Sequence, residues 1–411
     1  QRSRALRTLG EVLFGRGDQA AAEQAWLQAE QGLAKLPAAR ADVSLERGTV
    51  AYWMGNQAFQ RNQLDTAKRH FERYHTLMAA LLAQEPGNLV WQLELSYALN
   101  NLGSVAQKQG QAAAALKLFE ESAAIKERIV KAQPENTSLA VELADSWSWI
   151  GSTLEQRGRL LDAERYYERQ LALLREVGKR EPGTDGWRHR LALAELIAGN
   201  LAWALGHIDQ GGALLHHAEQ TLSDLVAADP SNSAWKRDWS YAQTQLAYWH
   251  LRQGRASEAR ALLTSAEARM GGLLSDDAPM DWRQVAVLVD LRLAQAMWYD
   301  HDTVSALQKL AAARSSAEAL IASDPLDTFN RSALARLQIT HGDWLRAESP
   351  QLAVDAWSEA RNLLDRPTGD PNWTTWPTWI AVQNRLGETD AASDLSKLRA
   401  TGYQLDPSEL P

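Results

Sequence analysis

The sequence predicts an all-α protein: a right-handed superhelical α-solenoid of about eight helix pairs, with a short extra pair as a C-terminal cap. Three observations support this prediction. Small residues, aromatic residues and prolines recur about every 48 residues over most of the chain. Within each period, apolar residues recur at three- and four-residue spacing, which is typical of amphipathic helices. Alanine, leucine, glutamine, glutamate and arginine dominate the composition, and these residues favour helices.

The repeat is clearest between successive prolines. The spans from Pro86 to Pro134 and from Pro134 to Pro182 are both 48 residues long. A small residue in the first helix of each unit recurs at steps of 45 to 48 residues, and its positions are Gly10, Gly55, Gly103, Gly151, Gly199, Ala247, Ala294 and Gly342. A second small residue follows twelve positions later, as Ala115 follows Gly103. Small residues allow two helices to cross closely, so these positions mark the helix crossings.

Each repeat is predicted to contain two helices separated by a glycine turn. The first helix runs from an opening aromatic residue to the turn, as from Trp91 to Gly110, and the second ends before the next proline. Since stacked pairs bury a core only between neighbours, we expect one domain over residues 1–411. The expected repeats are 3–37, 46–86, 89–134, 137–182, 185–230, 233–279, 281–325 and 328–366, followed by a C-terminal cap over 372–405.

Leu102-Gly103, Gly110, Ala115, Phe119 and Pro134 together resemble the tetratricopeptide repeat. The resemblance covers about residues 3–366. The usual period of that family is about 34 residues, so the longer period here predicts helices of about 18–22 residues. The resemblance implies a scaffold that binds a protein or peptide on the concave face formed by the first helix of each pair.

The candidate binding residues are those at the positions that line this concave face in the tetratricopeptide family. They lie at fixed offsets from the small anchor residue, and those singled out are Tyr52, Asn56, Asn100, Asn200, Trp203, Tyr241, Tyr248, Arg252, Trp298 and Tyr299. Aromatic and amide side chains suit an extended peptide, because they offer flat contact area and partners for its main chain. The alternative is that the aromatic residues only pack between long helices. One opening aromatic residue per repeat, such as Trp91, is interpreted as such a packing position.

Members of this family that bind chaperone tails hold a terminal carboxylate with asparagines and lysines. Asn56 and Asn101 occupy the asparagine positions of that pattern. The basic positions are occupied by Tyr52, Asp145 and Trp149, so we do not expect this clamp.

Composition and motifs argue against several other functions. The net charge of −8 disfavours binding to nucleic acid or to an anionic membrane surface. The chain has no cysteine, and the histidine pairs His70/His75 and His216/His217 have poor spacing for a metal. No zincin, nucleophile-elbow or phosphate-loop motif occurs. We therefore expect no enzyme activity, no cofactor and no metal.

Two functions remain. The first is a scaffold for protein–protein interaction, with a homo-oligomer also possible. The second is a ligand-sensing regulatory module of a larger bacterial signalling protein, because the repeats resemble regions attached to TIR, winged-helix or kinase domains. The chain starts at Gln1 without a signal peptide, and its first helix from Arg2 has no cap, so we expect residues upstream. Any membrane contact would come through that segment, and the absence of cysteine is compatible with either a cytoplasmic or a periplasmic location.

Overall fold

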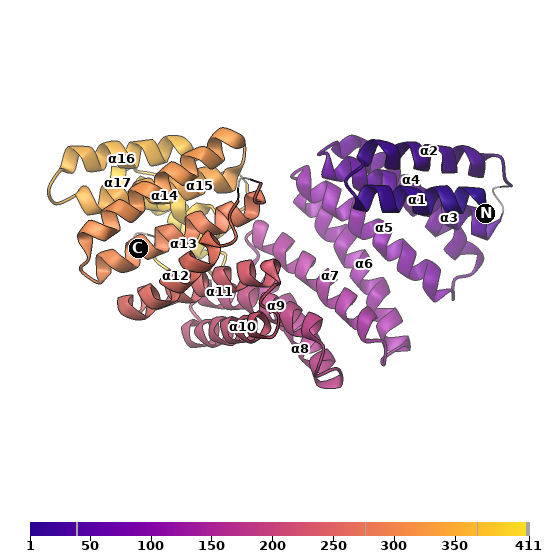
Figure 1. Cartoon of the computed structure of the whole chain (residues 1–411), viewed down its shortest axis with the longest axis horizontal. Helices are drawn as coiled ribbons and strands as arrows, with labels where there is room; N and C mark the ends of the chain where they lie inside the picture. Colours follow the sequence, from indigo (N-terminus) through magenta and orange to yellow (C-terminus); the bar gives the residue numbers. More distant parts are fainter. Residues whose placement is uncertain (38–39, 276, 368, 408–411) are drawn as a thin grey trace. The chain divides into compact units, whose positions relative to one another are not determined.

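The computed structural model describes residues 1–37, 40–275, 277–367 and 369–407. Over these ranges the chain forms 18 α-helices and no strand (Figure 1). The prediction of an all-α helical repeat is confirmed. No helix in the described part of the chain is both long and apolar enough to span a bilayer.

The chain divides into two compact units, Gln1–Thr153 and Leu154–Pro411. The prediction of one continuous domain over residues 1–411 stays a prediction. The first unit contains three helix pairs and most of α7. Its helices are α1 Arg2–Gly15, α2 Gln19–Ala34, α3 Ala41–Gln60, α4 Leu64–Gln84, α5 Leu89–Lys108, α6 Ala112–Ala132 and α7 Thr137–Gln156.

The second unit contains the end of α7, its partner α8, four further pairs and a shorter terminal pair. Its helices are α8 Leu160–Arg180, α9 Asp185–Ala204, α10 Ile208–Ala228, α11 Ser233–Arg252, α12 Ala256–Gly271, α13 Met280–Tyr299, α14 Thr303–Ser323, α15 Thr328–Leu345, α16 Pro350–Leu363, α17 Trp376–Leu386 and α18 Ala391–Arg399. Many of these helices have 20 or 21 residues, as the long period predicts.

In seven of the eight repeat pairs, a residue with a left-handed backbone lies in the turn and ends the first helix. Glycine supplies it in five pairs, with φ between 64° and 84°, for example at Gly110. In two pairs other residues take the same conformation, Asn62 at φ 58° and His301 at φ 66°. Since Asn62 and His301 occupy the glycine position of their repeats, the register continues through pairs that lack the turn glycine.

The small anchor residues leave room for aromatic rings of the next helix. A methyl group added to Gly103 would lie 2.6 Å from Cε1 of the fully buried Phe119. The same relation pairs Gly10 with Trp26, Gly55 with Phe71 and Gly342 with Trp357. The glycine is therefore required by the ring that it faces.

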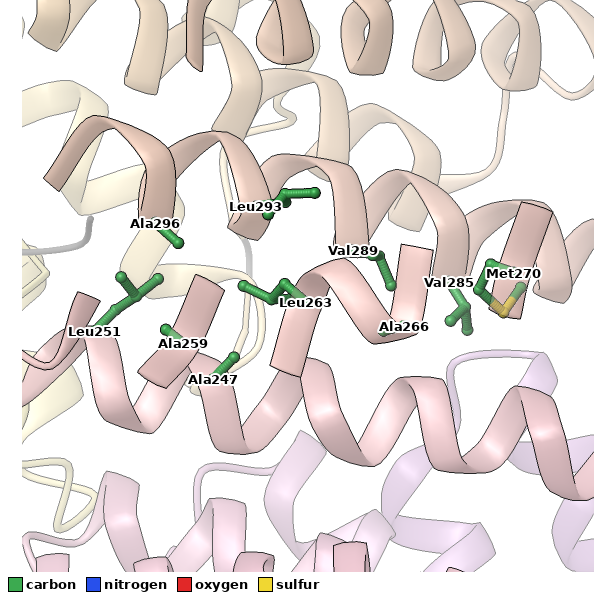
Figure 2. Close-up of a cluster of buried hydrophobic side chains, with 10 residues drawn as sticks. All are labelled: Ala247, Leu251, Ala259, Leu263, Ala266, Met270, Val285, Val289, Leu293 and Ala296. Carbon is green, nitrogen blue, oxygen red and sulfur yellow. The ribbon is translucent and has the colours of Figure 1, made fainter. Parts of the chain in front are cut away.

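Pairs with an alanine anchor are packed differently. Figure 2 shows the cluster between α11, α12 and α13, where Ala247, Ala259 and Leu263 are all fully buried. The residue sixteen positions after Ala247 is Leu263 rather than an aromatic ring. At these crossings glycine lies opposite a large ring and alanine opposite leucine, which keeps the crossing filled. Gly199 is an exception, because it faces Leu215 and the backbone of Gly211.

The C-terminal segment after α16 does not continue the repeat. α17 packs against α16 and α15, and the chain around α17 and α18 returns to the beginning of the second unit. Trp373 Nε1 donates a hydrogen bond to Glu155 Oε1 at 3.2 Å, and Gln404 N donates to Ala204 O at 2.9 Å. These contacts join residues about 200 positions apart and close the second unit on itself.

Candidate functional site

The second unit contains a partly open cavity of about 390 Å³. Every lining residue that belongs to a repeat comes from the first helix of its pair, and the remainder come from the C-terminal segment. The lining residues are Asn200, Trp203, Tyr241, Thr244, Gln245, Tyr248, Leu288, Arg292, Thr328, Phe329, Ser332, Ala333, Arg336, Ile339, Thr340, Trp373, Thr374, Thr375, Pro377, Thr378, Ala381, Tyr403 and Leu405. Four successive repeats and the cap therefore build one site.

Aromatic side chains form one wall of this cavity. The rings of Trp203 on α9 and Tyr248 on α11 meet edge to face, with centroids 4.9 Å apart. Trp203 is only 4% exposed, so this contact fixes the orientation of Tyr248. The guanidinium of Arg292 on α13 lies over the Tyr248 ring, 3.5 Å from the centroid of that ring. The wall is a stack of three side chains from three repeats.

Two arginines supply the charge of the cavity. Arg292 is buried and donates from Nη1 to Gln295 Oε1 at 2.8 Å. Half-buried Arg336 donates from Nε to Thr378 Oγ1 at 3.1 Å and from Nη2 to Thr374 O at 3.3 Å. Burial lowers the pKa of Arg292 to about 10, and the nearby charge of Arg336 contributes to that shift. Both groups remain protonated at neutral pH.

Four residues predicted from the sequence line this cavity: Asn200, Trp203, Tyr241 and Tyr248. The structure therefore brings together predicted residues from two repeats. Three more predicted residues lie in the same unit, but outside the described lining. They are Arg252, Trp298 and Tyr299.

Trp298 stacks on Trp344 of α15, with centroids 4.3 Å apart and nearly parallel planes. Tyr299 is 50% exposed. Arg252 lies close enough for its charge to act on the pKa of Arg292 and Tyr403. These three residues surround the cavity residues without contributing to the described wall.

The remaining predicted residues belong to the first unit. The Tyr52 ring contacts Trp53 edge to face at 5.1 Å and Tyr74 at 5.9 Å, and burial raises the pKa of its phenol. Asn56 is half-buried on the same helix. Asn100 Oδ1 is buried and has no hydrogen-bond partner among the described residues. A binding role for these three residues stays a prediction.

The arginines were not among the sequence-predicted site residues. Arg336 lies six residues before the anchor Gly342, at the same offset that places Tyr241 before Ala247. Extending that offset to the eighth repeat would have found it. Arg292 lies two residues before Ala294, at a position that the repeat pattern assigns to packing, and no sequence signal distinguishes it.

The contact between the cap and the start of the unit includes a carboxyl group with a perturbed pKa. Glu155 accepts hydrogen bonds from Tyr167 Oη at 3.0 Å and from Trp373 Nε1 at 3.2 Å. Burial raises the pKa of Glu155 to about 7, although both hydrogen bonds favour the charged form. Arg157 and Asp370 add an ion pair at 3.7 Å beside it.

Within the described ranges, no group of three or more His, Cys, Asp or Glu side chains is arranged to hold a metal ion. His217, one of the histidines with poor spacing for a metal, instead contacts a carboxylate, with His217 Nδ1 2.6 Å from Glu195 Oε2. The arrangement offers flat contact area, hydroxyls, amides and positive charge, which are the elements of a binding site.

Comparisons with known proteins agree with this architecture. The family model for the tetratricopeptide repeat matches residues 95–135, which confirms the resemblance predicted from the sequence. A comparison with curated proteins gives no match.

Three solved structures share the fold over nearly the whole chain. The apo form of RapI has a TM-score of 0.59 at 9% identity, covering 98% of this chain and 97% of its own. The apo form of the quorum sensor NprR from B. thuringiensis has a TM-score of 0.51 at 8% identity, and the match covers 97% of this chain and 98% of NprR. A Rap protein complexed with competence and sporulation factor has a TM-score of 0.50 at 12% identity, and the match covers 97% of each chain. The match over residues 95–135 identifies a tetratricopeptide repeat there, and the three structures show that the chain as a whole has a helical repeat fold.

Proposed function

We propose that this protein binds a peptide, or a peptide-like segment of a partner protein, in the cavity of the second unit. The observation that carries the proposal is the convergence of side chains from the first helices of four successive repeats on one cavity. Stacking alone does not require aromatic residues such as Trp203 and Tyr248 there, since the equivalent positions of the fourth repeat are Glu155 and Ser152, which are not aromatic.

The chemistry of the lining suits a main chain. The amide groups of Asn200 and Gln245 offer both donors and acceptors, which an extended peptide needs for its unpaired N–H and C=O groups. The Tyr248 ring and Leu288 offer apolar contact for its side chains. Aromatic residues at the centre of a contact site commonly contribute most of the binding energy.

The volume limits the occupant. About 390 Å³ lies within the roughly 300–1,000 Å³ range of small-ligand sites. Such a space accepts a few residues, and the cap formed by residues 369–407 bounds it on one side. A short peptide or a chain end therefore suits the cavity better than the surface of a folded domain.

A solved structure with the same fold also supports the proposal. One of the structures that share the fold is a Rap protein complexed with competence and sporulation factor. The identity of 12% establishes the fold alone, so the cavity chemistry has to identify the occupant here.

Selection from a randomised peptide library tests the proposal. The intact chain should retain a subset of peptides, and Tyr248→Ala should weaken their binding by about 2 kcal/mol, or about 30-fold, if Tyr248 is a hot spot. Val304→Ala on α14 is the control, because Val304 is 68% exposed on a second helix of its pair. Circular dichroism should show unchanged helical content in both variants. Equal affinity of the two variants would locate binding elsewhere.

The alternative function, a ligand-sensing regulatory module, is supported by a separate observation. Part of the cavity wall, including Trp373 and Tyr403, belongs to the cap that closes the second unit. An occupant would touch the cap directly, so binding would change how firmly the cap is held. Protection of residues 369–407 from proteolysis on peptide binding would favour sensing, and an unchanged cleavage rate would favour a passive scaffold.

A further inference from the structure

The charge of the cavity is opposite in sign to that of the chain. The chain carries a net charge of −8. Of the 23 described residues that line the cavity, two are charged at neutral pH, and both are arginines, Arg292 and Arg336. Two cations in a partly desolvated space repel each other, and an anion placed between them relieves that repulsion.

Arg336 is placed to contact an occupant. Its two described hydrogen bonds end on uncharged oxygens, Thr378 Oγ1 at 3.1 Å and Thr374 O at 3.3 Å. A guanidinium has five N–H donors, and these bonds use two of them. Burial lowers the pKa of Arg336, and the groups that act against this shift are the tyrosines Tyr248, Tyr403 and Tyr241 and not a carboxylate. The side chain is half-buried and lines the cavity, so an occupant can reach it.

Arg292 lies on the neighbouring helix of the wall. Its guanidinium stacks on Tyr248 and donates to Gln295, which holds the group in one orientation. Arg336 is close enough for its charge to lower the pKa of Arg292. The two guanidiniums therefore act on a common region, bordered by the hydroxyl groups of Thr244, Ser332 and Thr340.

We propose that this cavity recognises a carboxylate of its ligand, which Arg336 holds by charge-assisted hydrogen bonds while Arg292 adds positive charge beside it. The inference rests on the proposed function and specifies its ligand as a short peptide with a free C-terminal carboxylate. An aspartate or glutamate side chain carries the same group and is the other source. The residue next to the carboxylate would lie against the Trp203–Tyr248 wall.

This mode differs from the chaperone-tail clamp that the sequence disfavours. That clamp would use the asparagine and basic positions of the early repeats, where Tyr52 and Asp145 stand. Here the positive charge comes from α13 and α15, in the seventh and eighth repeats.

The test compares three randomised tetrapeptide libraries on the immobilised intact chain, with retained peptides measured by mass spectrometry. One library has free C-terminal carboxylates, one has C-terminal amides, and one has amides without aspartate or glutamate. In the third library, Arg336 can bond only uncharged oxygens, whereas a free acid offers it a carboxylate. Because charge-assisted hydrogen bonds are stronger, we expect free acids to be retained at least about tenfold better than the third library. Enrichment of the second library over the third, without an advantage for free acids, would identify a side-chain carboxylate as the source.

The variants separate this inference from the proposed function. R336Q should retain acids and amides equally, and R336K should keep a reduced preference, because lysine provides a charge without the planar fork. R331Q on the same helix is the matched control, since Arg331 pairs with Asp365 outside the cavity, and its preference should match that of the wild type. If circular dichroism shows that R336Q is unfolded, the acid preference of R336K is compared with that of R331Q instead.

Equal retention of acids and uncharged amides by the wild type would overturn the carboxylate inference and leave peptide binding intact. An acid preference that survives R336Q in a folded protein would also overturn it. Retention of no peptide from any library would overturn both the inference and the proposed function.

Discussion

Replacing Gly103 with alanine should destabilise the first unit, although alanine is the better helix former. The added methyl group would lie 2.6 Å from Cε1 and 2.8 Å from Cδ1 of Phe119. Carbon atoms pack at about 3.5–4.0 Å, so the ring has to move by about 1 Å. Phe119 is fully buried and its surroundings are densely packed, so we expect a cost of about 1–3 kcal/mol.

Urea unfolding followed by circular dichroism measures this cost. Gly178→Ala is the matched control, because Gly178 lies within α8 and a methyl group there meets nothing within 4 Å. It should stabilise its helix by about 0.5–1 kcal/mol. Phe119→Leu added to Gly103→Ala reproduces the combination found at Ala247 and Leu263, and should recover part of the loss.

The reasoning fails if Gly103→Ala and Gly178→Ala have the same effect. It also fails if Phe119→Leu lowers the free energy of unfolding by the same amount in the Gly103→Ala variant as in the wild type. The two substitutions would then be independent, and the added methyl group would not be in conflict with the Phe119 ring.

Two further predictions concern the turns and the cap. His301→Gly should stabilise the protein by about 0.5–1 kcal/mol, because relief of the left-handed strain exceeds the entropic cost of glycine; a lower melting temperature would contradict this. Because the pKa of Glu155 is raised to about 7 in the folded state, its contribution to stability is present below about pH 4.5 and is lost as the pH rises through 7. The wild type should lose on the order of 1–3 kcal/mol over that range relative to Glu155→Gln, as measured by urea midpoints at each pH. A constant difference between the two proteins would show that Glu155 titrates normally.

Much of the fold follows from short-range rules that the sequence carries openly. The anchors at 45- to 48-residue steps predict the helix crossings, and the glycine present in five of the turns predicts where the first helix ends. The same register places Tyr241 and Tyr248 on one first helix, and both line the cavity. A periodic sequence determines such positions because each repeat meets the same neighbours.

The parts that could not be predicted are those that break the period. Trp373 meets Glu155 across 218 residues, and no repeat position relates them. The C-terminal segment lines part of the cavity through residues such as Trp373 and Tyr403. That part of the wall could not be predicted from the repeats. Arg292 lies at a position assigned to packing, and only the structure shows its guanidinium over Tyr248.

The central claim is that the cavity of the second unit binds a peptide. Hydrogen–deuterium exchange of the intact chain, with and without a saturating selected peptide, tests it most directly. The account predicts slower exchange in Ser233–Arg252, in Met280–Tyr299 and in residues 373–405, with little change in the outer helices α12 and α14. Protection confined to α12 and α14, or to Gln1–Thr153, would contradict the claim.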